Sequence, residues 1–128
     1  MAETAAPTTA ATTLHALIRA GAEEATALSS PGGVPLTFGR LRALTDRTIA
    51  ALNAQGIGRN DRVGIVLDNG PEMAAAFIAI GAGTTAAPLN PSYKADEFTF
   101  YLSDLNARLL VVAAGSESPA VAVAARLR

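Results

Sequence analysis

Short apolar runs alternate with stretches of helical periodicity along the second half of the chain. Residues 63–67 form a nearly unbroken apolar run, which is typical of a parallel strand buried on both faces. Within 95–105, by contrast, large apolar side chains recur at i, i+3, i+4 and i+7, which predicts a helix with one buried face. The same reasoning predicts strands at 63–67, 85–89 and 108–114 and helices at 71–82, 95–105 and 120–128.

A helix and a hairpin are predicted near the start of the chain. Leu14 begins a stretch of helical spacing that continues to residue 25, directly after a capping threonine, Thr13. A turn at 31–33 then separates two short segments, 25–29 and 34–37, as expected of a hairpin.

The longest predicted helix follows the hairpin and begins at Phe38. Thr37 can cap its start, and Gly56 stops it. Arg42 and Asp46 are four residues apart, which predicts an ion pair on the outer face of this helix. Its predicted apolar face consists of Phe38, Leu41, Leu44, Thr48, Ile49 and Leu52.

Strands that alternate with helices predict an α/β fold with a partial parallel sheet and flanking helices. The order is βαβαβα behind the leading helix and the short hairpin, and right-handed crossovers are expected. The helix at 71–82 is apolar nearly all round, so we expect it to be buried. The aromatic side chains around 95–105 are expected in the core; they are Tyr93, Phe98, Phe100 and Tyr101. Because three strands make a small sheet and the last helix has no stop signal, we expect an incomplete part of a larger domain.

Composition and charge exclude several classes of function. The chain has 128 residues, of which 50% are hydrophobic, and a formal net charge of −1, so it lacks the basic surface of a nucleic-acid-binding protein. The absence of cysteine excludes disulfides, thiolate zinc sites and cysteine nucleophiles, and favours an intracellular origin. The most apolar stretch, 73–82, is about half of the roughly 20 residues that a membrane span requires.

The first residues differ in character from the rest of the chain. Residues 1–13 are small and polar, and they lack the charged and apolar parts of a secretory signal peptide. They predict a disordered tail, because such side chains cannot offset the entropy of ordering. Residues 14–128 are then the folded portion.

The segment 81–86 has the spelling of a phosphate-binding loop, Gly-Ala-Gly-Thr-Thr-Ala. Phosphate loops follow a strand and open a helix, so that backbone N–H groups and the positive helix end face the anion. Here the glycines follow a predicted helix and precede a predicted strand, where the helix dipole repels an anion. Leu89 also stands where a phosphate loop would carry a lysine. We therefore interpret Gly81 and Gly83 as helix-stop and turn glycines.

Two segments do have the order strand, loop, helix. The first, 67–73, contains a single glycine, and Glu72 opposes an anion there. The second, 89–97, is more polar. Its polar side chains follow the carboxyl end of a strand, where open α/β sheets often bind ligands. They are Asn90, Ser92, Tyr93 and Lys94, and a structural turn is the favoured interpretation over a ligand site.

The remaining candidates for chemistry are weak. His15 is the only histidine, and it is expected to be a surface residue of the first helix. Asp104 and Arg108 are expected to form no more than a surface pair. No residue is assigned as catalytic, as cofactor-binding or as a metal ligand.

With these segments placed, the chain resembles the AMP-forming acyl-CoA synthetases of the adenylate-forming superfamily. The resemblance covers about residues 14–112 and depends on the order and spacing of several short motifs. They are Leu36-Thr37-Phe38 with Leu41, then Gly56, Asp61-Arg62-Val63, Asn69 and Glu72, and then 81–91, which is similar to the family motif Gly-Ala-x-x-x-Pro-Leu-Asn-Pro. Residues 86–105 resemble most the oxalate–CoA ligase branch. Arg40 departs from the family's usual glutamate, so the reciprocal half of a capping box is lost.

The resemblance implies what the whole reaction would be. ATP and a small carboxylic acid give an acyl-adenylate, and CoA then gives the acyl-CoA, with Mg²⁺ assisting phosphoryl chemistry. The family's phosphate loop, ribose-binding Asp and catalytic Lys have no match among these 128 residues. We therefore expect the N-terminal segment of such a ligase, inactive alone and binding no cofactor itself. Its implied partner is the remainder of the ligase chain, with no nucleic-acid or membrane partner, and its location is intracellular, cytoplasmic or peroxisomal.

Two other hypotheses remain at this point. The chain could be a free-standing, non-catalytic α/β interaction module, or a nucleotide-binding domain that uses 81–86. We also expect an unfinished sheet edge and apolar helix faces, and hence poor solubility.

Overall fold

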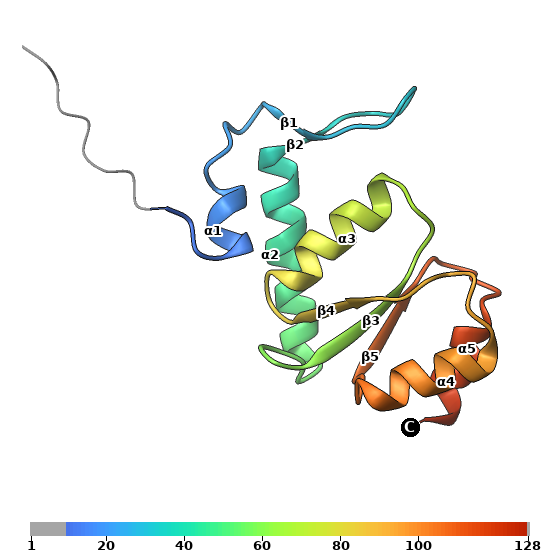
Figure 1. The fold of residues 1–128 in the computed structure, drawn as a ribbon. Coiled ribbons are helices and arrows are strands. Elements are labelled where there is room, and N and C mark those ends of the chain that lie inside the picture. The colour runs from blue at the N-terminus through green and yellow to red at the C-terminus, as the bar shows by residue number, and fades with distance from the viewer. Residues whose placement is uncertain (1–9, 128) are drawn as a thin grey trace, which may run out of the picture.

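The computed structural model describes residues 10–127, which form one three-stranded parallel sheet with helices on both faces and a small hairpin beside it (Figure 1). The predicted disordered tail falls largely on residues 1–9, which lie outside the described residues. The elements are α1 Leu14–Ile18, β1 Thr26–Leu28, β2 Leu36–Thr37, α2 Phe38–Ala54, β3 Arg62–Val66, α3 Pro71–Gly81, β4 Thr85–Pro88, α4 Ala95–Asp104, β5 Leu109–Val112 and α5 Pro119–Arg126.

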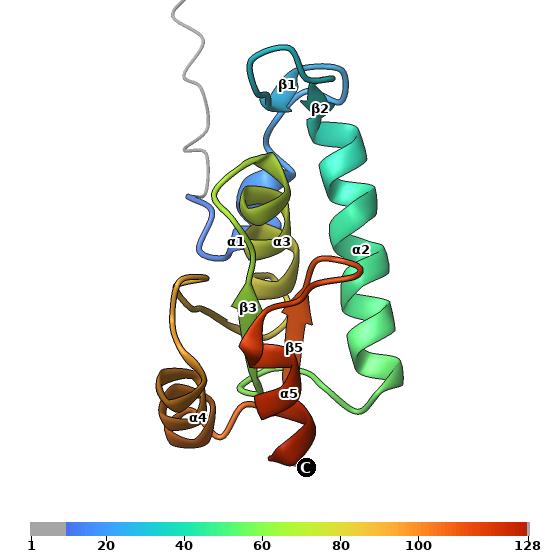
Figure 2. The same ribbon diagram turned by 90° about the vertical axis from the view of Figure 1, so that its right-hand side faces the viewer.

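The sheet has the strand order β4-β3-β5, and all pairs are parallel. The first strand in sequence is therefore the central one: Val63 lies opposite Ala86 on one side and opposite Leu109 on the other. Helices α2 and α3 cover one face, and α4 and α5 cover the opposite face (Figure 2). The predicted α/β class, with a partial parallel sheet and flanking helices, is confirmed.

The alternation of side chains along β3 divides the core into two clusters. Val63 and Ile65 point toward α2 and α3, where they pack with Leu52, Ile57 and Ile80. Val66 points to the other face, and its cluster is completed by Phe98, Leu102, Ala120 and Val123. Because β3 supplies both clusters, four of its five residues are buried, as its apolar run predicts.

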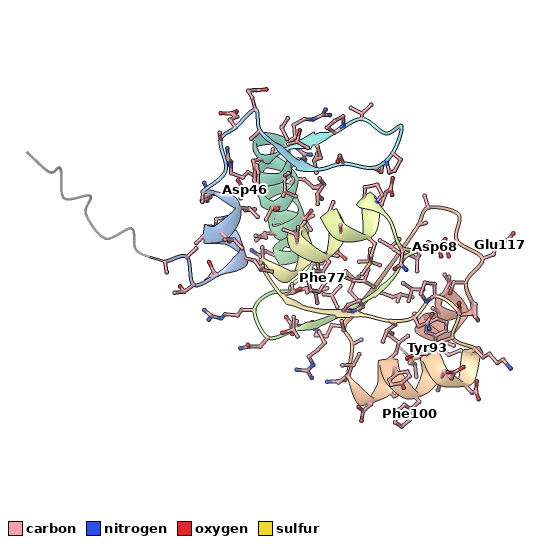
Figure 3. The ribbon with its side chains drawn as sticks, turned by 45° about the horizontal axis from the view of Figure 1, so that its top comes forward. Asp46, Asp68, Phe77, Tyr93, Phe100 and Glu117 are labelled. Carbon is pink, nitrogen blue, oxygen red and sulfur yellow. The ribbon has the colours of Figure 1, made fainter. Side chains whose placement is uncertain are left out.

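Helix α3 is less buried than its composition predicts. Only Ala79 and Ile80 are buried, and the ring of Phe77 is 41% exposed on the outer face (Figure 3). The prediction was wrong because α3 packs against α2, β4 and β1 over only part of its circumference, so the side that carries Phe77 stays exposed.

Two further predictions are corrected. Phe98 is fully buried, but Phe100 is 63% exposed and points away from the sheet (Figure 3), because residues two apart lie on nearly opposite sides of a helix. Helix α1 ends at Ile18 instead of continuing to residue 25. Arg42 Nη1 donates to the carbonyl oxygens of Ile18, at 3.1 Å, and Gly21, at 2.7 Å, so a side chain takes up carbonyls that a longer helix would use.

Candidate functional site

The segment 81–86 lies at the end of α3, as the sequence predicts. Gly81 is the last helical residue, and β4 begins at Thr85. Neither Gly81 nor Gly83 has a positive φ, so their role is not the left-handed turn that glycine usually supplies. A Cβ on Gly83 would stand 2.8 Å from Ile49 Cγ1 on α2, and one on Gly81 would stand 3.3 Å from Leu14 Cδ1. These glycines allow α3 to end against α1 and α2.

The backbone N–H groups of Ala82, Gly83, Thr84 and Thr85 already have partners. The amides of Gly83 and Thr84 both donate to the carbonyl of Ile80, at 3.2 and 2.9 Å, and the Thr84 hydroxyl donates to the same oxygen. The Thr85 amide donates to the carbonyl of Asp61 across the sheet, at 2.9 Å. An anion at this place would have to break bonds that hold the helix end and the strand. The segment therefore does not fit a nucleotide phosphate.

The polar loop that follows β4 is an internally bonded turn. The Asn90 side-chain oxygen accepts from the Ser92 amide at 2.9 Å, and the Asn90 carbonyl accepts from the Tyr93 amide at 3.1 Å. Glu97 accepts from the Lys94 amide at 3.1 Å and so caps the start of α4. The loop satisfies its own backbone, which agrees with the structural interpretation.

The ring of Tyr93 anchors this loop to α4. It stacks on Tyr101 with centroids 5.0 Å apart and meets Phe98 edge to face at 5.8 Å. A hydrogen bond with Tyr101, together with burial, raises the pKa of the Tyr93 hydroxyl above its usual value. The Tyr93 hydroxyl thus remains protonated at neutral pH, which suits an anchoring role better than general-base chemistry.

The strand order identifies a different position for a ligand, which the sequence alone did not predict. In a doubly wound sheet, the crevice lies at the carboxyl ends of neighbouring strands whose following helices cover opposite faces. Both neighbours of β3 meet this description, because α3 covers one face and α4 and α5 cover the other. The loop after β4 is the internally bonded turn described above, so the further position lies between β3 and β5. The adjoining loops are 67–70 and 113–118. Only the spatial order of strands reveals this position, and local periodicity carries no signal for it.

The charges at this position oppose a phosphate ligand. Asp68 and Glu117 are exposed on the two loops (Figure 3), and Glu72 lies in the first turn of α3. Neither loop contains a lysine or arginine. Arg62 and Arg108 lie instead at the amino ends of β3 and β5, on the opposite edge of the sheet. The crevice is therefore acidic and does not fit ATP.

The arginines at the amino edge fix the sheet to its connecting loops. Arg62 Nε donates to the carbonyl of Leu105 at 2.7 Å and so holds the end of α4. Arg108 bonds the Asp61 carboxylate at 3.2 Å and the carbonyl of Gly56 at 3.1 Å. The predicted pair of Arg108 with Asp104 is therefore wrong, because Asp61 offers a carboxylate that also accepts from the Gly58 amide at 2.8 Å. The Gly58 N–H and then Arg108 hold the pKa of Asp61 below its usual value.

A small charged cluster joins α1 to α2. His15 Nε2 lies 3.2 Å from Asp46 Oδ1, and the Arg19 guanidinium lies 3.7 Å from the same oxygen. Asp46 therefore pairs with α1 and not with Arg42, which corrects the predicted pair within α2. His15 is a partly exposed helix residue, as expected, and its carboxylate partner comes from 31 positions further along the chain.

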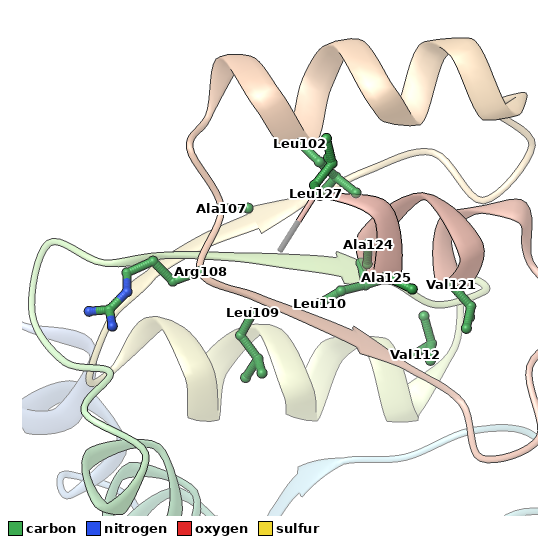
Figure 4. A pocket seen from close by; sticks show the side chains of 10 residues that line it. All are labelled: Leu102, Ala107, Arg108, Leu109, Leu110, Val112, Val121, Ala124, Ala125 and Leu127. Carbon is green, nitrogen blue, oxygen red and sulfur yellow. The ribbon is translucent and has the colours of Figure 1, made fainter.

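Two hollows lie on either side of β5. One, of about 370 Å³, is formed by β5, α4 and α5 (Figure 4). The other, of about 500 Å³, lies between α2 and α3 and reaches Val111. Their walls are mainly apolar, with Arg108 in the first and Thr48 and Glu72 in the second, and neither gathers convergent polar groups of the kind that orient a small substrate. Among residues 10–127, no three histidine, aspartate or glutamate side chains come together closely enough to hold a metal ion.

Comparison with known proteins agrees with the sequence motifs. The family model described as AMP-binding enzyme matches residues 16–127, almost the whole described chain. The chain belongs to this family. An oxalate–CoA ligase of Arabidopsis thaliana is 40% identical over 104 residues, which are 80% of this chain and 20% of the ligase. A probable CoA ligase of Humulus lupulus is 36% identical over 119 residues, 90% of this chain and 23% of that protein. The chain thus spans about a fifth of the length of these relatives.

Solved structures of AMP-binding enzymes share the fold. Apo MatB of Rhodopseudomonas palustris superposes with a TM-score of 0.76 and 23% identity, over 89% of this chain and 23% of MatB. Its ATP-bound form superposes equally well. The resemblance to AMP-forming acyl-CoA synthetases is confirmed. In residues 10–127, no helix combines the length and apolar character needed to cross a membrane.

Proposed function

We propose that this chain is the N-terminal scaffold segment of a longer ATP-dependent acid–CoA ligase and that it is catalytically inactive alone. The whole ligase would form an acyl-adenylate from ATP and a small carboxylic acid, and then transfer the acyl group to CoA. Support comes from the family match and from CoA ligases that are about four times as long as this chain and similar over 80–90% of it.

The observation that carries the proposal is the closed hydrogen bonding of the glycine segment. Gly83 and Thr84 donate to the end of α3, and Thr85 donates to β3, so none of these amides can cradle phosphate. Attack on the α-phosphate requires cationic groups that converge on it. The described arginines near the sheet are engaged with loop carbonyls and Asp61. ATP binding would therefore be the task of the rest of the ligase.

The scaffold role follows from what these contacts join. Asp61, Arg62 and Arg108 hold the loops before β3 and β5 and the end of α4 in one place. Asp61 and Arg62 belong to the Asp-Arg-Val motif that this chain shares with acyl-CoA synthetases, and Arg108 bonds Asp61. The motif then serves to fix the first strands of the ligase sheet.

We further propose that the acid is oxalate or another short carboxylic acid, because the Arabidopsis relative is named an oxalate–CoA ligase. The partner of the chain is then the remainder of the ligase, and neither nucleic acid nor a membrane is a partner. An intracellular location, cytoplasmic or peroxisomal, fits the absence of cysteine.

An ATP–pyrophosphate exchange assay tests this function. The 128-residue chain alone is expected to give no exchange with oxalate, malonate or acetate. The Arabidopsis ligase can be produced separately without the part that matches this chain. Adding that protein to the 128-residue chain is expected to restore exchange with oxalate. Exchange by the chain alone contradicts inactivity, and failure to restore exchange in mixed or fused form contradicts the ligase assignment.

The coding sequence downstream of Arg128 gives an independent check. A stretch of the form Ser-Gly-Thr-Thr-Gly-x-x-Lys within about a hundred codons supports the ligase, because it supplies the glycine amides and the cation that a phosphate loop needs. An immediate stop codon supports a free-standing interaction module.

A further inference from the structure

We propose that Asn69 and Gly70 form a site of spontaneous deamidation, at which Asn69 is converted to aspartate and isoaspartate in the folded chain and the start of α3 is loosened. Both residues are exposed in the loop between β3 and α3. The modification goes beyond the proposed function, because its chemistry requires only the chain and water. It is supported by the differences between Asn69 and the other four asparagines of the chain.

The reaction joins the side-chain carbon of an asparagine to the backbone nitrogen of the next residue. The Gly70 nitrogen loses its proton to a solvent base and attacks Cγ of Asn69. A bond forms between these two atoms, the bond from Cγ to Nδ2 breaks, and Nδ2 leaves as ammonia with protons from solvent. Water then opens the cyclic imide. Cleavage of the new bond gives aspartate, and cleavage of the original peptide bond gives isoaspartate. One water is consumed and one ammonia is released, with no oxidation or reduction.

The attacking nitrogen of Gly70 is available. Its N–H donates to no carbonyl or side chain within residues 10–127, although the Gly70 carbonyl accepts from the Ala74 amide at 3.1 Å. An N–H group that is already hydrogen-bonded must give up that bond before its nitrogen can react, so an unbonded one removes a step. Because residue 70 has no Cβ, no side chain crowds the approach of its nitrogen.

The side chain of Asn69 is not held in place either. It makes no hydrogen bond within the described part of the chain, and α3 begins without a side-chain cap. The carboxamide can therefore turn so that Cγ meets the nitrogen of Gly70. Exposed loops of this kind have the local mobility that such a rearrangement needs.

Two of the other asparagines are prevented from reacting by their position in the chain. Asn53 lies within α2, where helical hydrogen bonds hold the backbone. Asn90 precedes Pro91, whose nitrogen carries no proton to lose. The side-chain oxygen of Asn90 also accepts from the Ser92 amide at 2.9 Å, which restrains its carboxamide.

The remaining two asparagines precede amides that are hydrogen-bonded. The residue after Asn60 donates its amide to the carbonyl of Gly58 at 3.0 Å. The residue after Asn106 donates its amide to the carbonyl of Leu102 at 3.1 Å. Asn69 therefore differs from all four in combining an unrestrained side chain with an unbonded glycine nitrogen.

Isoaspartate at position 69 would change the connection between β3 and α3. The backbone then passes through Cγ, which inserts one carbon atom into a short loop. Leu67 and Met73, on the two sides of this loop, pack against the core, so the added length cannot be absorbed without moving one of them. We expect the hydrogen bond from the Ala74 amide to the Gly70 carbonyl to open more often, and the Ala74 amide to exchange faster.

Incubation of the folded 128-residue chain in neutral buffer, followed by mass spectrometry of its tryptic peptides, tests the site. The peptide 63–94 contains both Asn69 and Asn90, so fragmentation compares the two within one molecule. Asn69 is expected to lose its amide first, and an isoaspartate-specific methyltransferase is expected to label this peptide. If Asn69 stays intact in the folded chain while the free peptide 66–73 loses its amide, the inference is overturned. Equal loss at the other asparagines also overturns it.

Gly70→Ala is the matched variant. A Cβ at this position would stand 3.4 Å from Glu72 Oε2, at the flexible end of an exposed side chain, and φ is extended, so the fold is kept. Loss of the Asn69 amide is expected to slow at least about tenfold, because the methyl group raises the barrier to attack. Gly58→Ala is the control and should leave the rate at Asn69 unchanged. An unchanged rate in Gly70→Ala, or an equal effect of both variants, contradicts the inference.

Hydrogen exchange of the Ala74 amide tests the effect on α3. Exchange is expected to be faster in the wild-type chain after incubation than before, and to stay unchanged in incubated Gly70→Ala. Isoaspartate at position 69 without faster exchange at Ala74 overturns the proposed loosening of α3. None of these measurements uses ligase activity, so this inference and the proposed function can fail separately.

Discussion

Gly83 lies directly against Ile49, so that a Cβ on the glycine would stand 2.8 Å from Ile49 Cγ1. This contact joins the end of α3 to the middle of α2. It explains why a segment that has the spelling of a phosphate loop contains glycine here. The residue is small because two helices meet, and its amide is directed to the carbonyl of Ile80.

Gly83→Ala is therefore expected to destabilise the fold. The added methyl group overlaps Ile49 in a packed region, so we expect the free energy of unfolding to fall by about 1–3 kcal/mol in urea denaturation. The double variant Gly83→Ala/Ile49→Ala should show a favourable coupling of about 1 kcal/mol, because the obstructing carbon is gone. Gly58→Ala is the matched control: its nearest neighbour would be an ordinary contact at 3.5 Å, and little change is expected. Equal losses from the two single glycine variants would contradict the packing role.

Arg42 is expected to hold the loop after α1 in place. Because its guanidinium is bonded to the carbonyls of Ile18 and Gly21, Arg42→Met should lower the free energy of unfolding by about 1.5–3 kcal/mol. Arg47→Met, at an exposed position of the same helix, is the control and should change stability by less than about 0.5 kcal/mol. Exchange of the α1 amides should rise in the first variant only. A similarly small effect of both substitutions would contradict this role of Arg42.

Thr45 is completely buried on α2, and its hydroxyl has no hydrogen-bond partner among the described residues. Thr45→Val keeps the shape and removes the unpaired polar atom, so we expect the free energy of unfolding to rise by about 1 kcal/mol. Thr48→Val is the control. The Thr48 hydroxyl donates to the carbonyl of Leu44 at 2.8 Å, so its removal should not raise the free energy of unfolding. Thermal denaturation of both variants decides the matter: a loss of stability in Thr45→Val would show that its hydroxyl is satisfied in solution.

Asp61 is expected to make stability fall in acid. Its pKa is lowered in the folded chain, by the Gly58 N–H first and then by Arg108, relative to its ordinary value of 3.8. A carboxylate with a depressed folded pKa contributes stability above its unfolded pKa, and this contribution is lost as the pH falls through the lower folded value. Between pH 5 and 2, the free energy of unfolding should therefore fall more steeply with decreasing pH in the wild type than in Asp61→Asn. A wild-type slope in Asp61→Asn would reject this linkage.

The sequence predicts most of the fold because its local signals are strong. The run at 63–67 has the continuous apolar character of a central parallel strand, and Thr13 and Thr37 cap the helices that follow them. The helix Pro71–Gly81 begins at its proline as predicted, because the missing N–H costs nothing at that position.

The two wrong ion pairs share one cause, which is competition from residues far away in sequence. Arg42 has Asp46 one turn away, but it bonds carbonyls 21 and 24 positions earlier in the chain. Arg108 likewise prefers Asp61, at a separation of 47 residues, over the nearby Asp104. No local pattern encodes these choices. The exposure of Phe77 has a related origin, because composition shows that α3 is apolar without showing how much of it the fold covers.

The position of a ligand crevice was also beyond local reasoning. It depends on β3 lying between β4 and β5, which follows from long-range pairing of strands. The chain order around 81–86 was sufficient, however, to exclude a phosphate loop there.

The most direct test of the account is an NMR titration of the 128-residue chain with Mg²⁺–ATP, following the backbone amides of Gly83, Thr84 and Thr85. Because these amides are bonded to Ile80 and Asp61, we predict no saturable shift in any of them up to millimolar nucleotide. Saturable shifts at these three amides, lost in a variant that alters the segment but still folds, would contradict the claim that this part of the ligase is scaffold.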